Sequence, residues 1–166
     1  MKSRIQNPAV LVPGVLQSLQ ATSLAIEKAG LPKRTLELVH LRASQINGCS
    51  VCVDMHSQIL KMQKENDQRL YSVAAWRDAP YFTEAERAAF ALTEAVTRLS
   101  DREEPVPDSI WNAAAELYSE QELGALILAI AMINVWNRVN VSTKQVAGEW
   151  AKSEEARQWL ENLATR

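Results

Sequence analysis

The amino-acid sequence predicts an all-α protein, a single-domain helical bundle of about seven or eight helices that covers residues 1–166. Three observations support this fold class. Apolar residues make up 47% of the chain, which holds only 5 glycines and 6 prolines. Apolar residues recur at the helical spacing of three and four positions. Alternating β-branched runs, the pattern of a strand, are missing from the sequence.

In the N-terminal half, helix boundaries follow from stop signals. The segment Gly30-Leu31-Pro32 ends one helix, Asn47-Gly48 ends the next, and residues 65–68 (ENDQ) break a third. We expect helices over about residues 15–29, 32–47 and 48–64, and a short fourth helix capped by Asn66 or Asp67.

In the C-terminal half, two capping boxes mark helix starts, at Thr83–Glu86 and Ser119–Glu122. Pro107 suits the first turn of another helix. We expect helices over about residues 83–99, 107–118 and 119–138, and an amphipathic helix over 153–164. The apolar run at 123–136 is shorter than a membrane span, so we expect a buried core helix there and no membrane segment.

Composition excludes several classes of protein. The net charge of −2 provides no basic surface for DNA or RNA. The N-terminal apolar stretch is brief and broken by Pro8 and Pro13, so we expect no cleavable signal and a cytoplasmic protein. In a reducing compartment, a lone cysteine pair is more often catalytic or metal-binding than structural.

The stretch INGCSVCVDMHSQ, residues 46–58, holds the only two cysteines and one of two histidines. On a helix, Cys49 and Cys52 lie about 60° apart on one face with Cα atoms roughly 5 Å apart, which a disulfide accepts. We expect Asn47 to cap this helix and Cys49 to lie in its first turn, where the helix dipole lowers the pKa of a thiol. The pair is predicted to open and close without refolding.

His56 follows Cys52 by four residues, so its ring is expected beside the Cys52 sulfur, where it can accept the thiol proton directly or through one water. A catalytic imidazole usually has its other nitrogen held by a carboxylate. Glu37 is the candidate, because it and His56 lie at similar distances on opposite sides of the turn; a solvated surface charge is the alternative. His40 is a rival partner, but we expect it to be a core or surface histidine with satisfied hydrogen bonds.

Three other interpretations of the cysteine pair compete with a redox pair. Buried structural cysteines are common, but a Cys-x-x-Cys at a helix start followed by His is not their usual pattern. A structural zinc site needs about four ligands, and only Cys49, Cys52, His56 and either His40 or Glu37 are available. A thioredoxin-like motif sits in a βαβ unit, which this sequence does not predict. We therefore expect no metal and no cofactor.

The pattern Glu-x(11)-Cys-x-x-Cys-x-x-x-His, met by Glu37, Cys49, Cys52 and His56, resembles that of the AhpD-like alkylhydroperoxidases of the carboxymuconolactone decarboxylase superfamily. The stretch LRASQINGCSVCVDMH is similar to the signature of that family. The stretch AMINVWNRVNVS, residues 131–142, resembles a later helix of the family in which Asn and Trp line the core near the site.

The resemblance implies an all-helical, AhpD-like fold that assembles into homo-oligomers, trimers or hexamers. It implies a peroxidase that reduces small organic hydroperoxides. In that reaction Cys52, deprotonated through His56 and Glu37, attacks the O–O bond and becomes a sulfenic acid. Cys49 then condenses with it, and an external dithiol reductant opens the disulfide.

The residues alone do not decide which cysteine attacks or which of several functions the pair serves. Helix position favours Cys49 as the more acidic thiol, whereas His56 favours Cys52; we expect Cys52 to attack, because a positioned base provides a proton path. Some family members carry a second histidine between the cysteines, where this chain has Val51. Alternative functions are a non-catalytic thiol–disulfide redox sensor and a decarboxylase-like lyase, and the presence of both cysteines argues against the lyase.

The five tryptophans are expected to lie mostly in the core, since Trp is usually largely buried. Trp150 and Trp159 are candidates for a contact between subunits.

Overall fold

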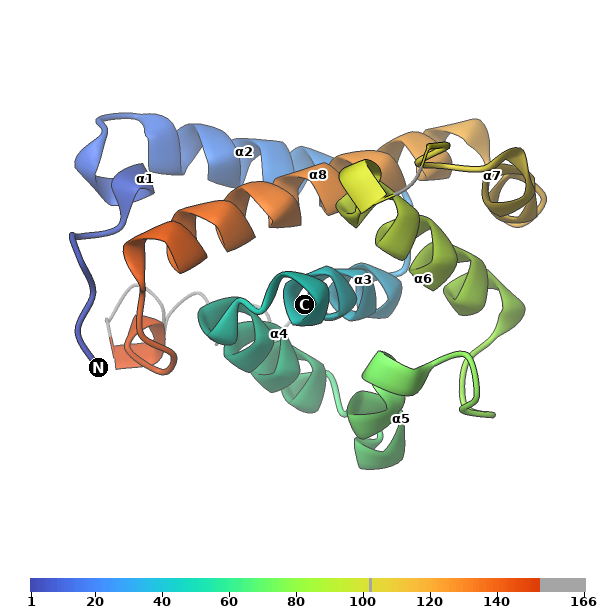
Figure 1. Ribbon diagram of the computed structural model, residues 1–166, viewed down its shortest axis with the longest axis horizontal. Helices are drawn as coiled ribbons and strands as arrows, with labels where there is room; N and C mark the ends of the chain where they lie inside the picture. The colour runs from blue at the N-terminus through green and yellow to red at the C-terminus, as the bar shows by residue number, and fades with distance from the viewer. Residues whose placement is uncertain (102, 153–166) are drawn as a thin grey trace.

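The computed structural model describes residues 1–101 and 103–152, which form helices joined by short loops (Figure 1). These residues contain eight α-helices, three 3-10 helices and no strand, which confirms the predicted all-α class. The elements in chain order are α1 Pro8–Leu11, α2 Val15–Glu27, α3 Lys33–Asn47, α4 Ser50–Met62, α5 Asp67–Ser72, η1 Val73–Ala75, α6 Glu84–Thr97, η2 Leu99–Asp101, α7 Asp108–Ala115, α8 Glu120–Thr143 and η3 Trp150–Lys152.

The two helices that the sequence marks with capping boxes start where predicted. The Thr83 hydroxyl accepts the backbone N–H of Glu86 at 3.2 Å, and the Glu86 carboxylate accepts the N–H of Thr83 at 2.8 Å, so α6 begins at Glu84. Ser119 and Glu122 make the same reciprocal pair at the start of α8. Such a pair satisfies N–H groups that the first turn leaves without partners.

Other boundaries differ from the prediction. Helix α8 continues to Thr143, well beyond its predicted end, because polar residues in its last turns such as Asn140 are buried against other helices. Helix α7 ends earlier than predicted, at Ala115. The four-residue α1 was not predicted, although Asn7 caps it and Pro8 begins it. The amphipathic helix predicted over 153–164 lies outside the described residues.

Helix α3 is the central element. It packs against α4, α6 and α8, and Figure 1 shows it between α8 and α4. One core cluster, with Val39 and Ile130 at its centre, fills the space between α2, α3, α6, α7 and α8. A second cluster around Leu60 and Phe90 joins α3, α4 and α6 to α5 and η1. Because α3 belongs to both clusters, packing fixes its position relative to α4 and α8.

Helix α8 is the one helix among the described residues that is long and apolar enough, by length and composition, to cross a bilayer. Its packing is nevertheless that of a core helix. Residues along its whole length are buried against α2, α3 and α6, and they include Asn134, Asn137 and Asn140, whose side chains are hydrogen-bonded. These buried, paired amides give α8 its polar contacts within the bundle.

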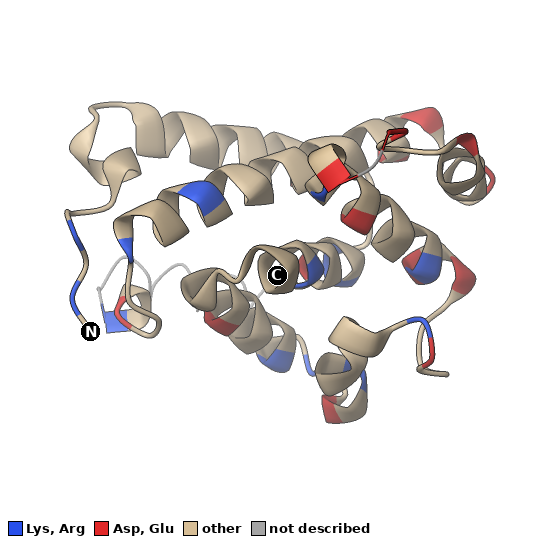
Figure 2. Cartoon of the chain, viewed as in Figure 1, with Lys and Arg blue, Asp and Glu red and all other residues tan. Residues whose placement is uncertain are grey.

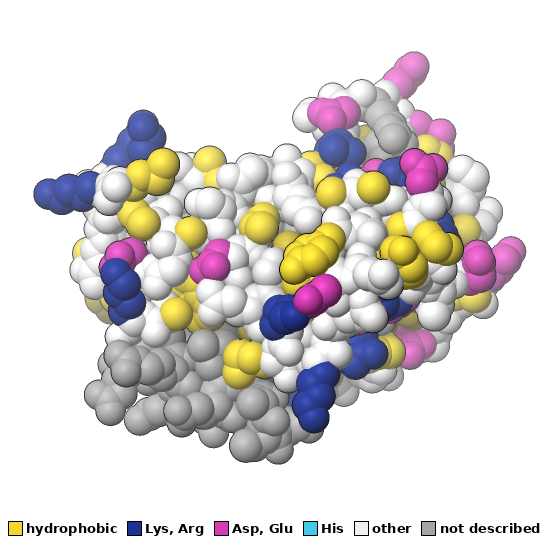
Figure 3. All heavy atoms as spheres, turned by 90° about the horizontal axis from the view of Figure 1, so that it is seen from below, with side chains coloured by type: hydrophobic (Ala, Val, Ile, Leu, Met, Phe, Trp, Pro, Cys, Tyr) yellow, Lys and Arg dark blue, Asp and Glu magenta, His cyan; other side chains and the backbone are white. Residues whose placement is uncertain are grey.

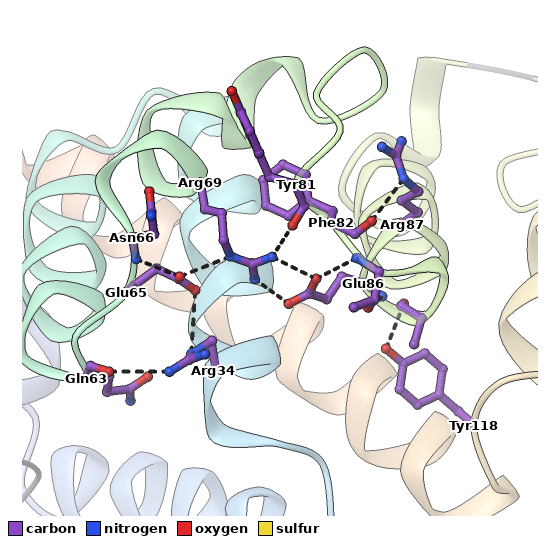
Figure 4. A network of polar contacts seen from close by, with 12 residues as sticks. Arg34, Gln63, Glu65, Asn66, Arg69, Tyr81, Phe82, Glu86, Arg87 and Tyr118 are labelled. Atoms are coloured by element: carbon purple, nitrogen blue, oxygen red, sulfur yellow. Dashed lines mark hydrogen bonds and ion pairs between the residues drawn. The ribbon is translucent and has the colours of Figure 1, made fainter.

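A network of ion pairs ties α5 to α3 and α6 (Figure 4). Arg69 donates to Glu65 at 3.0 Å and to Glu86 at 2.5 Å, and it also bonds the carbonyl oxygen of Tyr81. Glu65 Oε2 lies 3.6 Å from Arg34 Nε at the start of α3. Both carboxylates are buried, and buried charges need such partners. The network therefore holds the α4–α5 segment in place beside α3.

Charge is unevenly distributed over the molecule. In Figure 2, carboxylates gather around α7 and the starts of α6 and α8, whereas the N-terminal segment and the C-terminal half of α8 carry lysine and arginine, which also lie on α3, α4 and α6. These two cationic segments meet, since Arg4 N–H donates to the carbonyl of Thr143 at 2.9 Å. On the face in Figure 3, apolar side chains lie in small groups among charged ones.

The tryptophans divide between core and surface. Trp76 is buried, and Trp136 and Trp150 are partly buried against the cluster that holds the cysteines. Trp111 is 42% exposed and is an exception to the prediction that most tryptophans lie in the core, because the short α7 turns only Ala114 fully inward. Trp159 lies outside the described residues.

Candidate functional site

The turn between α3 and α4 carries the cysteines. Gly48 ends α3 with φ at 65°, in the left-handed region that glycine adopts without strain. Cys49 caps α4: its Sγ accepts the backbone N–H of Cys52 at 3.3 Å. The prediction that Asn47 caps this helix is therefore wrong. Asn47 is the last residue of α3, and its side chain is turned toward α8 instead.

The sulfurs of Cys49 and Cys52 are joined in a disulfide, with Cα atoms 5.4 Å apart, close to the spacing predicted from the helix. Only 1% of Cys49 and 0% of Cys52 is exposed. The surrounding cluster is apolar and consists of Ala43, Val51, Ile133, Trp136 and Trp150. The pair closes within the regular geometry of α4, which fits a redox role.

Three asparagines on α8 face the turn. Asn134, Asn137 and Asn140 follow one another at intervals of three and so share one side of the helix. The Asn47 amide donates to Asn134 Oδ1 at 3.0 Å and to Asn137 Oδ1 at 2.8 Å. Asn140 Nδ2 donates to the Cys52 sulfur at 3.3 Å. The sequence indicated them only through the family resemblance of residues 131–142, in which Asn and Trp line the core near the site, and it assigned no role to each asparagine.

A pocket of about 450 Å³ opens beside the disulfide. Cys49 lines it, and so does Asn140, whose amide contacts the Cys52 sulfur. The charged side chains in its lining are Lys2 and Lys144, and no carboxylate lines it. The volume suits a small molecule, and the lysines favour an anionic one. Cys49 is therefore the cysteine of the pair that a reagent in this pocket approaches, since Cys52 does not line it.

Glu37 and His56 are in contact across the turn, as the sequence predicts. Glu37 Oε2 lies 2.7 Å from His56 Nδ1, and only 15% and 7% of the two side chains is exposed. Burial alone would raise the pKa of Glu37, but the charge and hydrogen bond of His56, helped by the charge of His40, hold that pKa below its ordinary value. An ionised carboxylate in this position holds the imidazole with its proton on Nδ1.

The other ring nitrogen of His56, Nε2, is buried and has no hydrogen-bond partner among the described residues. Cys52 precedes His56 by one turn of α4, but no hydrogen bond joins Nε2 to the sulfur in this disulfide form. The sequence-based expectation of a direct proton path is therefore not met in the oxidised state. With the Nδ1 proton donated to Glu37, Nε2 is the nitrogen that can accept a proton.

His40 is a third member of the site, and the prediction that its hydrogen bonds are satisfied is wrong. Its Nδ1 lies 3.9 Å from Glu37 Oε1, and its ring centroid is 4.9 Å from that of His56. Although 21% of the side chain is exposed, Nδ1 is enclosed and has no hydrogen-bond partner among the described residues. Burial and, to a smaller extent, the charge of His56 lower the pKa of His40 to about 4, although the charge of Glu37 opposes them. This environment of His40 results from tertiary packing, since α4 places His56 against α3.

Comparison with known proteins identifies related sequences. The model of the carboxymuconolactone decarboxylase family matches residues 13–95, a range that contains Glu37, both cysteines and His56. The uncharacterized protein YdfG of Bacillus subtilis is 34% identical over 116 residues, which are 70% of this chain and 78% of YdfG. The uncharacterized protein YnjA of Escherichia coli is 31% identical over 103 residues, 62% of this chain and 55% of YnjA.

Solved structures agree with this grouping. The protein ATU0492 of Agrobacterium tumefaciens, which is described as an antioxidant defence protein of the AhpD type with unknown function, superposes with a TM-score of 0.81 at 34% identity, over 88% of this chain and 98% of its own. The debrominase Bmp8 superposes with a TM-score of 0.73 at 19% identity, over 91% of this chain and 77% of Bmp8. At that identity the likeness to Bmp8 concerns the fold alone.

Proposed function

The chain belongs to the carboxymuconolactone decarboxylase family, as an AhpD-like member, and from this premise we propose that it is a dithiol peroxidase. It reduces small organic hydroperoxides with Cys49 and Cys52 as the redox pair. Glu37 and His56 form the proton relay. The substrates are a hydroperoxide and an external dithiol reductant, and no cofactor takes part.

One observation carries the proposal: a dithiol pair that closes within one helical turn shares α4 with an imidazole held by a buried carboxylate. The Cα atoms of the two cysteines are 5.4 Å apart, so a disulfide forms without a change of backbone. The 2.7 Å contact between Glu37 and His56 leaves Nε2 as the free acceptor. A structural disulfide needs no such base, whereas a peroxidase does.

The reaction proceeds in three balanced steps. His56 takes the proton of the Cys52 thiol, and the thiolate attacks the terminal oxygen of the hydroperoxide. The O–O bond breaks, Cys52 becomes a sulfenic acid, and the alkoxide leaves as an alcohol with the proton from His56. The Cys49 thiol then displaces the hydroxyl group as water and forms the disulfide. A dithiol donor reduces the disulfide and is itself oxidised to a disulfide.

The pocket beside Cys49 supports this division of roles. A donor thiolate attacks the disulfide sulfur that it reaches, and Cys49 lines the pocket whereas Cys52 does not. Attack at Cys49 releases Cys52 as the leaving thiolate, ready for the next hydroperoxide. A reducing cytoplasm, the compartment that we propose, supplies dithiols for this step.

The test is consumption of cumene hydroperoxide with dihydrolipoamide as the donor. We expect turnover by the wild type and none by Cys52→Ser. Cys49→Ser should react once and accumulate a sulfenic acid that dimedone traps, whereas Cys52→Ser should not. His56→Ala should slow thiol oxidation by about a hundredfold or more. Ser57→Ala, a conservative change at the residue after His56 on α4, is the matched control.

Three outcomes would contradict the proposal. Oxidation of the pair once, without turnover in the presence of donor, would favour the redox sensor. Trapping of sulfenic acid on Cys49 in the Cys52→Ser variant would exchange the roles of the cysteines. Decarboxylation of a muconolactone by the Cys49→Ser, Cys52→Ser double variant would favour the lyase.

A further inference from the structure

We propose that Glu37, His40 and His56 form a binding site for a divalent transition metal ion, for which Zn²⁺ is the best match. The site uses two imidazole nitrogens and one carboxylate oxygen, and neither cysteine takes part. The proposed site therefore differs from the four-ligand zinc site weighed in the sequence analysis, which would include Cys49 and Cys52.

The three side chains converge because of how α3 and α4 pack. Glu37 and His40 are three residues apart on α3 and so share one face of it, and His56 approaches that face from α4. One ligand atom from each residue lies within 4.8 Å of the other two. Ligands of a tetrahedral Zn²⁺ lie about 3.3 Å from one another, as bonds of about 2.0 Å require.

Each imidazole lies beside a different oxygen of the Glu37 carboxylate. Oε1 is 3.9 Å from His40 Nδ1, and Oε2 is 2.7 Å from His56 Nδ1. Coordination through one carboxylate oxygen therefore requires the carboxylate and the two rings to turn, so that this oxygen and both nitrogens lie about 3.3 Å from one another.

The second observation concerns unpartnered nitrogens. His40 Nδ1 and His56 Nε2 are both buried, and neither has a hydrogen-bond partner among the described residues. Such buried, unpaired groups are rare and unfavourable. The proton relay accounts for Nε2 of His56 but gives His40 no role. A metal ion coordinated by Nδ1 of His40 accounts for that nitrogen.

The ligand types select the metal. Two imidazoles with one carboxylate is a common ligand set of zinc, with a fourth position left for water. Ca²⁺ and Mg²⁺ prefer sites made of oxygen ligands alone. An ion has access from solvent, since 15% of the Glu37 side chain and 21% of the His40 side chain is exposed.

Metal binding would regulate the thiol pair, a consequence that rests on the proposed function. An ion that holds Glu37 and His56 together takes the relay's carboxylate and imidazole out of proton transfer. Zn²⁺ would then slow thiol oxidation, and a chelator would restore it. The binding itself needs no catalysis and can be tested without it.

The test uses the oxidised, full-length protein, because its disulfide keeps both sulfurs from the metal. Titration against a chromophoric zinc chelator should give one Zn²⁺ per chain. His40→Ala and His40→Asn should weaken the affinity by at least about tenfold. Glu84→Gln, which alters an exposed carboxyl at the start of α6, should leave it unchanged. Circular dichroism checks that each variant is folded.

X-ray absorption at the zinc edge supplies a readout independent of activity. We expect nitrogen and oxygen ligands, a histidine signature that weakens in His40→Ala, and no sulfur. Affinity that is equal in wild type and both His40 variants would overturn the site, as would sulfur ligands. If zinc binds as expected but no peroxide is consumed, the metal site stands and the proposed function fails. If peroxide is consumed but zinc does not bind at these residues, the metal site alone is rejected.

Discussion

Among single residues, Glu37 offers the sharpest test of the relay. Glu37→Gln keeps the size of the side chain and a hydrogen bond to His56, but it removes the negative charge that stabilises an imidazolium. We expect the rate of peroxide-driven disulfide formation at pH 7 to fall about a hundredfold. Stopped-flow measurement of thiol loss in a single turnover checks this.

The pH dependence of the Glu37→Gln reaction rate separates a role of Glu37 in proton transfer from a structural role. The deficit of Glu37→Gln should narrow as the pH approaches about 8.5, where a free thiol ionises without a base. A packing defect would slow the reaction at every pH. Glu84→Gln serves as the control and should follow the wild type. A Glu37→Gln rate equal to that of the wild type at pH 7 would remove Glu37 from the relay.

A substitution of Lys144 tests whether the positive charge of the pocket beside Cys49 selects the reductant. Lys144→Glu reverses one of the two lysine charges in its lining. We expect reduction of the disulfide by anionic dihydrolipoate to slow about tenfold at low salt, and reduction by uncharged dithiothreitol to change by less than about twofold. Lys33→Glu, an exposed change at the start of α3, should affect neither rate. Equal slowing with both reductants would show that charge does not select the donor.

Among the helices, α3 and α6 are joined through one buried carboxylate. Glu94 on α6 accepts hydrogen bonds from Arg42 on α3 at 2.6 and 2.8 Å, from Trp76 at 2.8 Å and from Arg77 at 2.8 Å. Burial alone would raise the pKa of Glu94, but the hydrogen bonds from Trp76, Arg77 and Arg42 outweigh it and hold the pKa below 4.5. Its stabilising effect is therefore present above the unfolded-state pKa and is lost as the pH falls through the folded-state pKa.

This linkage predicts a pH-dependent cost for Glu94→Gln. At pH 7 the substitution should lower the free energy of unfolding by about 3 kcal/mol, because it leaves the charge of Arg42 without its partner. The difference from wild type should shrink as the pH falls below 4.5 toward the lowered folded-state pKa of Glu94, because the wild-type carboxylate then also loses its charge. Urea denaturation at pH 7 and pH 3.5 measures both values, with the exposed Glu116→Gln as control. A difference that is the same at both pH values would contradict the electrostatic origin.

The elements that sequence reasoning predicted are those that local forces decide. The starts of α6 and α8 follow from capping boxes, in which all partners lie within four residues. The end of α8 was missed because no local signal marks it, whereas a tertiary contact supports its last turns: the Asn140 amide meets the Cys52 sulfur, 88 residues away. At such positions, tertiary contacts override helix propensity.

The features of the candidate site also divide into those set by local sequence and those set by tertiary packing. The spacing of Cys49 and Cys52 and the contact of Glu37 with His56 follow from one helix and one turn, so they were predictable. The asparagine contacts of the turn and the unsatisfied Nδ1 of His40 depend on how α8 and α4 pack onto α3. Three-dimensional packing alone reveals them, and the metal site proposed above depends on it.

At the scale of the whole molecule, one side of α8 remains to be explained. Its inner side is buried in the bundle, yet Leu128 is 53% exposed, Val135 is 39% exposed and Val141 is 47% exposed. Leu128 and Val135 are two turns apart and so lie on the same face. A second copy of the chain is the occupant that we propose for this face, in line with the homo-oligomer, a trimer or hexamer, that the sequence predicts.

Assembly through α8 makes a prediction for the solution state. Sedimentation velocity at micromolar concentration should show an oligomer for the wild type, and Leu128→Glu should shift it toward monomer because a charge cannot be buried in an apolar contact without a partner. Leu117→Glu changes an equally apolar side chain, 47% exposed just after α7, and should leave assembly intact. Circular dichroism should show the same helix content in all three proteins. A wild type that sediments as a monomer, or a Leu128→Glu variant that assembles as well as Leu117→Glu, would exclude this face of α8 as the subunit contact.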